Sequence, residues 1–97
     1  MRFEWDEAKN TANFRKHGVY FEAAEEVFAS QVLTIADTRR DYGEPRYITL
    51  GSLRGRVVVI VHTPRGSSTR IVSMRKANEQ ERASYQKFLE AARHAKG

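Results

Sequence analysis

The spacing of hydrophobic residues changes character twice along the chain, which predicts helices towards both ends and strands between them. Residues 20–28 carry apolar side chains at i, i+3, i+4, i+7 and i+8, the pattern of an amphipathic helix that begins near Tyr20: Tyr20, Ala23, Ala24, Val27 and Phe28. An earlier helix is expected from Asp6, a helix-capping residue, to His17, with Gly18 placed to end it. Phe3–Trp5 is expected to form a short opening strand.

Four strands are predicted in the middle of the chain, over Val32–Asp37, Arg46–Leu50, Val57–Val61 and Thr69–Arg75. The third is entirely aliphatic and mostly β-branched, which is typical of a strand buried on both faces. Short connections follow the second and third strands, with a hairpin turn expected over Gly51–Gly55 and another turn over Thr63–Ser68. Such short turns imply an antiparallel meander.

A last helix is predicted from the capping pair Asn78 and Glu81, with an apolar stripe at Tyr85, Phe88, Leu89 and Ala92. The predicted order of elements is therefore βααββββα. It indicates an α+β fold with an antiparallel four-stranded core sheet, two N-terminal helices and one C-terminal helix, the helices covering one face of the sheet. At 97 residues the chain is expected to be a single domain, 1–97.

Positive charge is concentrated in the second half of the chain. Residues 1–49 carry seven Lys and Arg against nine Asp and Glu, a net charge of −2, whereas residues 50–97 carry ten against three, a net charge of +7. Twelve of the 17 basic residues are arginine, whose planar fork suits phosphate oxygens. This distribution favours an acidic partner such as nucleic acid; the alternative is a solvated basic surface.

Composition also excludes several classes of protein. The chain has no cysteine, which removes disulfides, thiol catalysis and thiolate zinc sites. The sequence shows no cluster of His, Asp and Glu at ligand spacing, so neither a metal nor another cofactor is expected. No apolar run approaches the roughly 18 residues that span a bilayer, and residues 1–6 lack the apolar stretch of a secretion signal. We therefore expect no membrane association and a cytoplasmic location.

The segment Arg65–Arg75 places three guanidinium groups on one turn and strand. Arg65 is expected at the turn, while Arg70 and Arg75 are expected on opposite faces because side chains alternate along a strand. Together with Arg46 on a neighbouring strand, these side chains could converge over one shallow hollow and neutralise charge on a phosphodiester. The alternative for each arginine is a surface ion pair, which is worth little.

Proton transfer in such a site has four candidate residues. His17 and His62 could act as acid or base near neutral pH. The alternatives are a helix-capping role for His17 and a hydrogen-bonded position at the edge of the core for His62. Glu44 is either a base or the ion-pair partner of Arg46, and Tyr85 belongs to an apolar stripe that favours a core position.

The first long helix carries further polar candidates. Lys9, Asn13, Lys16 and His17 lie on neighbouring turns of the helix predicted to end at His17. These four side chains could form a polar wall over the cleft, in which Lys9 and Lys16 bind RNA. A solvated helix face, with Asn13 bonded to a loop backbone, is the alternative.

Several short motifs resemble the BrnT family of toxins, which are members of the RelE-like ribonuclease group. The matching pieces lie between Phe3 and Tyr85 and include Phe3-Glu-Trp-Asp6, Lys16-His-Gly-Val19, Gly43-Glu-x-Arg46, His62-Thr-x-Arg65 and Arg70-Ile-Val-Ser-Met-Arg-Lys-Ala77. The resemblance implies a RelE-like fold and places Arg75 near the functional cleft. Met74 departs from the family pattern, which more often has alanine there, and could alter how Arg75 is presented.

The resemblance also implies an activity and partners. It implies a ribonuclease toxin that is neutralised by a BrnA-like antitoxin, in a hetero-oligomer that binds operator DNA mainly through the antitoxin. With the arginine-rich segment, this leads to the hypothesis of metal-independent RNA cleavage by 2′-OH attack. The alternatives are a non-enzymatic module that binds RNA or DNA, and an inactive toxin relative that acts with its antitoxin as a transcriptional autorepressor.

Overall fold

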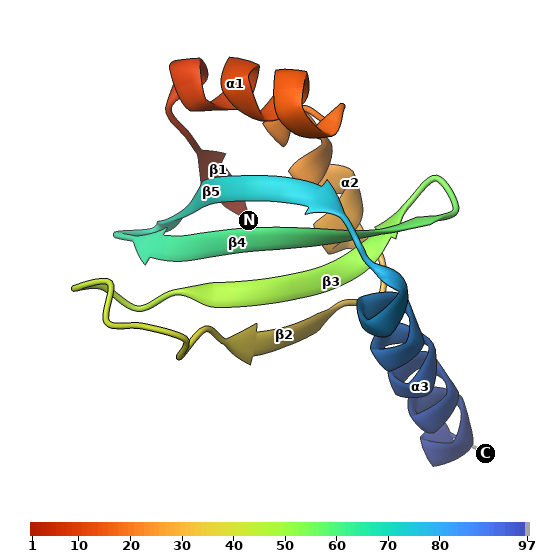
Figure 1. Cartoon of the computed structure of the whole chain (residues 1–97). Helices are drawn as coiled ribbons and strands as arrows, with labels where there is room; N and C mark the ends of the chain where they lie inside the picture. The colour runs from red at the N-terminus through yellow and green to blue at the C-terminus, as the bar shows by residue number, and fades with distance from the viewer. Residues whose placement is uncertain (97) are drawn as a thin grey trace.

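A five-stranded sheet lies at the centre of the structure, a computed structural model that describes residues 1–96 (Figure 1). The strands are β1 (Arg2–Glu4), β2 (Leu33–Ala36), β3 (Tyr47–Leu53), β4 (Arg56–Arg65) and β5 (Ser68–Lys76), in the spatial order β1-β5-β4-β3-β2. The antiparallel meander from β2 to β5 confirms the prediction for the middle of the chain. The predicted four-stranded, purely antiparallel sheet is wrong, because β1 adds a fifth strand parallel to β5.

The helices are α1 (Glu7–His17), α2 (Ala24–Ala29) and α3 (Glu79–Lys96), with a 3₁₀ turn, η1 (Phe21–Ala23), before α2. Asp6 caps α1 as predicted, since its carboxylate accepts the Lys9 N–H at 3.2 Å. Gly18 ends the helix in the left-handed region with φ 73°. The capping pair of α3 is also confirmed, because Asn78 and Glu81 each accept the other's backbone N–H.

The 3₁₀ turn changes both the predicted order and the apolar stripe of the second helix. Its i→i+3 geometry has about three residues per turn, so side chains of residues 20–23 do not follow the α-helical phase assumed for this stretch. Phe21 consequently lies in the core at 0% exposure, while Tyr20, which we predicted to be in the stripe, is 48% exposed.

Helices pack on both faces of the sheet, so the prediction that they cover one face is also wrong. Alternate residues of β4 point to opposite sides, with Ile60 in one hydrophobic cluster and Val59 in another. The first cluster joins the sheet to η1 and α2 and contains Phe21, Ala24, Val27, Val58, Ile60, Ile71 and Met74. The second joins it to α3 through Tyr85, Phe88 and Leu89. From there α3 extends beyond the sheet (Figure 1).

The hairpin between β3 and β4 is tighter than predicted. Its turn residues are Arg54 and Gly55, both with positive φ (51° and 82°), as in the two-residue turns that match the twist of a hairpin. Gly51, which we predicted to be in this turn, instead lies within β3 against α2. A Cβ at this position would lie 2.7 Å from Val27 Cγ1, so the close packing of α2 on β3 depends on the missing side chain.

Asn13 of α1 closes the part of the sheet edge that β1 leaves open. β1 pairs only with residues 68–70 of β5. Further along the strand, Asn13 accepts the Met74 N–H at 3.2 Å and donates to the Met74 carbonyl at 2.8 Å, as a neighbouring strand would. Its amide also donates to the Val19 carbonyl at 3.0 Å. The predicted bond from Asn13 to a loop backbone is thus present, and the same side chain fixes α1 to β5.

None of the helices within residues 1–96 combines the length and the apolar character needed to cross a membrane.

Candidate active site

A β-bulge places Arg70 and Arg75 on the same face of the sheet. The register between β4 and β5 shifts at Val61/His62, where Val61 pairs with Ser73 and His62 pairs with Ile71, so that Val72 has no partner of its own. Arg75 pairs with Val59 and Arg70 pairs with Thr63, two positions four residues apart on a regular strand. The prediction that these two arginines lie on opposite faces is therefore wrong.

We call this side of the sheet, opposite α2, the arginine face. Met74 points to the other side, where it is fully buried in the core, so its bulk does not stand beside the Arg75 guanidinium. By strand alternation Arg65 also belongs to the arginine face, and Arg46 directly precedes β3 on the same side. The fold thus gathers all four arginines of the sequence hypothesis on one surface.

These arginines are not free, however. Arg75 makes a bidentate pair with Glu81, with both N–O distances 2.7 Å. Arg70 donates to Glu4 at 3.0 Å. Convergence of unpaired guanidinium groups over a hollow is thus not what the structure contains, and the arginine distribution does not by itself establish a nuclease.

Glu44 lies between the other two arginines. Its carboxylate oxygens are 3.5 Å from Arg46 Nε and 4.0 Å from Arg65 Nη2. Arg46 also stacks over the ring of Tyr42 at 4.2 Å, and its buried Nε has no hydrogen-bond acceptor within the described chain. Glu44 is therefore an ion-pair partner here, the second of the two roles considered for it.

His17 lies at the end of α1, near Arg75. Its pKa is lowered below the ordinary value by partial burial and by the positive charges of Lys16 and Arg75. The neutral form is consequently favoured at neutral pH, which is the form that a general base requires. Arg75 has a raised pKa and Glu81 a lowered one, chiefly because each hydrogen-bonds the other.

His62 lies on the opposite side of the sheet from the arginine face. It is 8% exposed, its Nε2 lies 2.7 Å from the Thr49 hydroxyl, and the edge of its ring packs against Phe28. Burial lowers its pKa. The sheet separates it from Arg75, so its grouping with the other catalytic candidates is wrong, and its role here is the hydrogen-bonded core position.

The remaining candidates divide between core and surface. Tyr85 is 4% exposed and its hydroxyl donates to the Gln31 carbonyl at 2.5 Å, as expected for a residue of the apolar stripe. Lys9 and Lys16 are exposed on α1, the helix that carries His17.

Sequence reasoning missed Arg39, which the pattern assigned only to a polar turn. The positive charge of Arg39 is close enough to lower the pKa values of both Arg75 and Glu81. The sequence signal that could have found it is the spacing Asp37-x-Arg39, since an aspartate commonly accepts hydrogen bonds from the residue two positions on.

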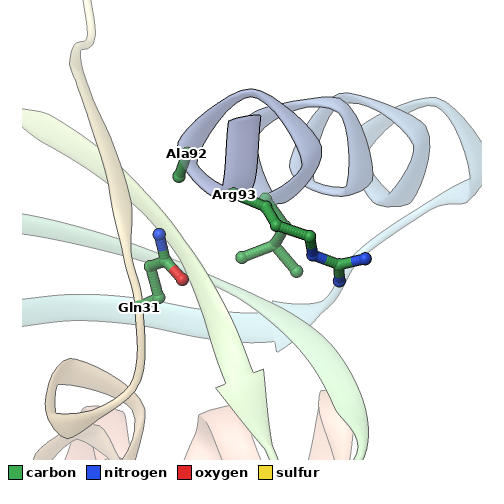
Figure 2. A pocket seen from close by; sticks show the side chains of 4 residues that line it. Gln31, Ala92 and Arg93 are labelled. Carbon is green, nitrogen blue, oxygen red and sulfur yellow. The ribbon is translucent and has the colours of Figure 1, made fainter. Parts of the chain in front are cut away.

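A hollow of about 320 Å³ lies beside α3, away from these residues. Figure 2 shows it between Gln31 and the later turns of α3, where Leu89, Ala92 and Arg93 complete its lining. None of the candidate catalytic or RNA-binding residues lines it.

Comparison with known proteins identifies the family. No curated protein matches the chain. The sequence model of a family described as "Ribonuclease toxin, BrnT, of type II toxin-antitoxin system" matches residues 5–81, which include every strand from β2 to β5 and the residues of the arginine face. The chain therefore belongs to the BrnT family of ribonuclease toxins of type II toxin–antitoxin systems.

Proposed function

We propose that this toxin cleaves RNA on the arginine face without a metal ion, by attack of a 2′-OH on the adjacent phosphorus. The O2′–P bond forms while the P–O5′ bond breaks, which leaves a 2′,3′-cyclic phosphate and a 5′-OH. The reaction requires a base for the 2′ proton, donors for the charged phosphoryl oxygens and a proton for the departing O5′.

The observation that carries the proposal is that Asn13, one turn before His17 on α1, is hydrogen-bonded to the backbone of Met74, the residue before Arg75. His17, neutral because of its lowered pKa, accepts the 2′ proton and returns it to O5′. Arg75 stabilises the phosphoryl charge through its planar fork.

For this, Arg75 must exchange Glu81 for phosphate. The Arg75 and Glu81 side chains are 37% and 24% exposed, so the pair remains open to solvent. A phosphodiester offers two oxygens in a geometry similar to that of the Glu81 carboxylate, so the planar guanidinium fork of Arg75 can bind it in place of the carboxylate.

The other charged groups of the arginine face hold the RNA strand. Arg46, Arg65 and Arg70 contact phosphates on either side of the cleavage point. Glu44 keeps Arg46 and Arg65 in place. Lys9 and Lys16 add positive charge along α1.

The test is RNA cleavage in EDTA by purified protein, with His17→Gln and Arg75→Gln compared with His94→Gln and Arg93→Gln. The controls remove the same residue types from exposed positions of α3. We expect the His17 variant to lose about 10²–10⁴-fold in rate, the usual contribution of a general base, and the controls to retain full rate. Unchanged cleavage by the His17 variant would refute its role.

A wild-type protein that binds RNA in a salt-dependent manner but never cleaves it would instead support the non-enzymatic alternative. Growth arrest on expression provides a second readout, and its severity should follow the cleavage rates of the same variants.

Type II membership implies an antitoxin partner. We infer that a BrnA-like antitoxin covers the arginine face, and that the hetero-oligomer binds operator DNA mainly through the antitoxin. A purified complex should therefore cleave RNA more slowly than the free toxin. Equal rates would exclude masking of this face.

A further inference from the structure

The loop between β2 and β3 contains an enclosed carboxylate with four hydrogen-bond donors. The Asp37 side chain has no solvent exposure. It accepts hydrogen bonds from Arg39 Nε and Nη2, both at 2.8 Å, from the Arg39 backbone N–H at 3.2 Å and from the Tyr42 hydroxyl at 3.0 Å. A buried charge with so many donors fixes the groups that bind it.

The arginine on this carboxylate is nevertheless exposed. The Arg39 side chain keeps 64% of its surface in contact with solvent, although its orientation is set by the two-point pair. A guanidinium has five N–H donors, and Asp37 takes two of them. The remaining donors therefore face solvent from a fixed position, which is how a preorganised anion-binding group is built.

Arg39 is connected to the arginine face through Asp37 and Tyr42, which both contact Arg46. Asp37 is hydrogen-bonded to Arg46 through its backbone N–H, beside the first residue of β3. Tyr42, which binds Asp37, also carries the stacked guanidinium of Arg46. The positive charge of Arg39 also lowers the pKa values of Arg75 and Glu81.

We propose that Arg39, fixed by Asp37, is a further RNA-binding residue that contacts a phosphate next to the one being cleaved. The inference rests on the proposed function and extends it to a residue outside the Arg65–Arg75 segment. Arg39 differs from Arg70 and Arg75 in its exposure to solvent, since 64% of its side-chain surface is exposed, against 27% for Arg70 and 37% for Arg75. It can bind phosphate without giving up its ion pair.

The test is binding of a uniformly 2′-O-methylated RNA, which cannot be cleaved by 2′-OH attack. In the double variant Asp37→Asn/Arg39→Gln the net charge is unchanged and no buried charge is left unpaired. The matched control is Arg40→Gln/Asp41→Asn, which makes the same change of charge with two exposed residues of the same loop.

We expect the Asp37/Arg39 variant to bind about tenfold more weakly, as for loss of one charge-assisted contact. The slope of log affinity against log salt should fall by about 0.7, the value for one phosphate contact on a single strand. The control should match the wild type. A folded Asp37/Arg39 variant with wild-type affinity and slope, or a control that weakens as much, would overturn the inference.

A second variant tests the inference if the double variant does not fold. Arg39→Lys keeps a cation beside Asp37 but loses the planar fork, so it should still bind RNA more weakly than the wild type. Equal binding would refute the role of Arg39.

Cleavage of unmodified RNA, measured in parallel, distinguishes this inference from the proposed nuclease function. If the wild-type protein cleaves RNA and the Arg39 variants bind RNA as tightly as it does, only the role of Arg39 is refuted. If the Arg39 variants bind more weakly but the wild-type protein does not cleave RNA, only the nuclease mechanism is refuted. Wild-type protein that neither binds nor cleaves RNA refutes both.

Discussion

Replacing Asn13 with alanine tests how the edge of the sheet is closed. The substitution removes both partners of Met74 and the donor to the Val19 carbonyl, three hydrogen bonds in all. Met74 is fully buried, so its N–H and C=O would be left without a partner in the core. The same change also removes the side-chain link that holds α1 and His17 against β5.

The expected cost follows from these bonds. Each intramolecular hydrogen bond contributes about 1 kcal/mol net, so losing the three bonds costs at least about 3 kcal/mol, and the stranded polar groups of the buried Met74 backbone add to this cost. For a domain of this size such a loss lowers the melting temperature by on the order of 15 °C, and it is a substantial fraction of a typical total stability of about 5–15 kcal/mol.

Urea denaturation followed by circular dichroism would measure the loss directly, with Thr11→Ala as the control at an exposed position of the same helix. Asn13→Asp separates the donor from the acceptor. It can still accept the Met74 N–H, but it places an anionic oxygen against two carbonyl oxygens, so it should be at least as unstable as the alanine variant. A loss of less than 1 kcal/mol for Asn13→Ala, or a stable Asn13→Asp protein, would refute this account of the sheet edge.

Two other predictions concern stability. Gly51→Ala should cost about 1–3 kcal/mol in urea denaturation, because the new methyl group meets Val27 Cγ1 at 2.7 Å; an unchanged midpoint would show that α2 moves aside freely. The buried His62 should make stability fall as pH drops below about 6.5, because its folded pKa is lowered and protons then bind preferentially to the unfolded chain. His62→Gln should flatten the dependence between pH 7 and pH 5, whereas His94→Gln should not; equal slopes in all three proteins would refute the assignment.

The parts of the fold that the sequence predicted correctly depend on local signals. Asp6 and Gly18 set the limits of α1 through contacts within one or two turns, and Asn78 with Glu81 does the same for the start of α3. The meander follows from short connections between apolar runs. Such signals lie within a few residues of the element that they specify, so they can be recognised in a single sequence.

The errors have a different physical origin. A short strand was expected over Phe3–Trp5, but its place in the sheet is decided by parallel pairing with residues 68–70, which are far away in the sequence. The 3₁₀ turn shifts the helical phase by less than one residue per turn, which hydrophobic spacing does not resolve. The face of the sheet that α3 covers depends on the packing of Tyr85 and its neighbours against residues distant in the sequence, which a local pattern does not indicate.

Within the candidate site, the sequence indicated which residues to consider but not which ion pairs they form. The candidates identified from the sequence included Arg46, Arg65, Arg70 and Arg75. The ion pair of Arg70 with Glu4 could not be predicted, because Glu4 lies 66 positions before Arg70 and no local pattern connects the two residues. Glu81 was recognised only as a helix cap, although the same carboxylate binds Arg75. Arg39 was missed because its significance depends on the enclosure of Asp37, which only the folded chain defines.

The unpaired Val72 has a consequence for chain length. Arg70 and Arg75 are five positions apart, so on a regular strand they would point to opposite sides and one guanidinium group would enter the apolar interior. Deletion of one residue between them would leave four positions and regular alternation, and both arginines would still share a face. Relatives that keep both arginines at the present separation must therefore also keep the irregularity, whereas a relative one residue shorter here can lose it without moving either arginine to the other side.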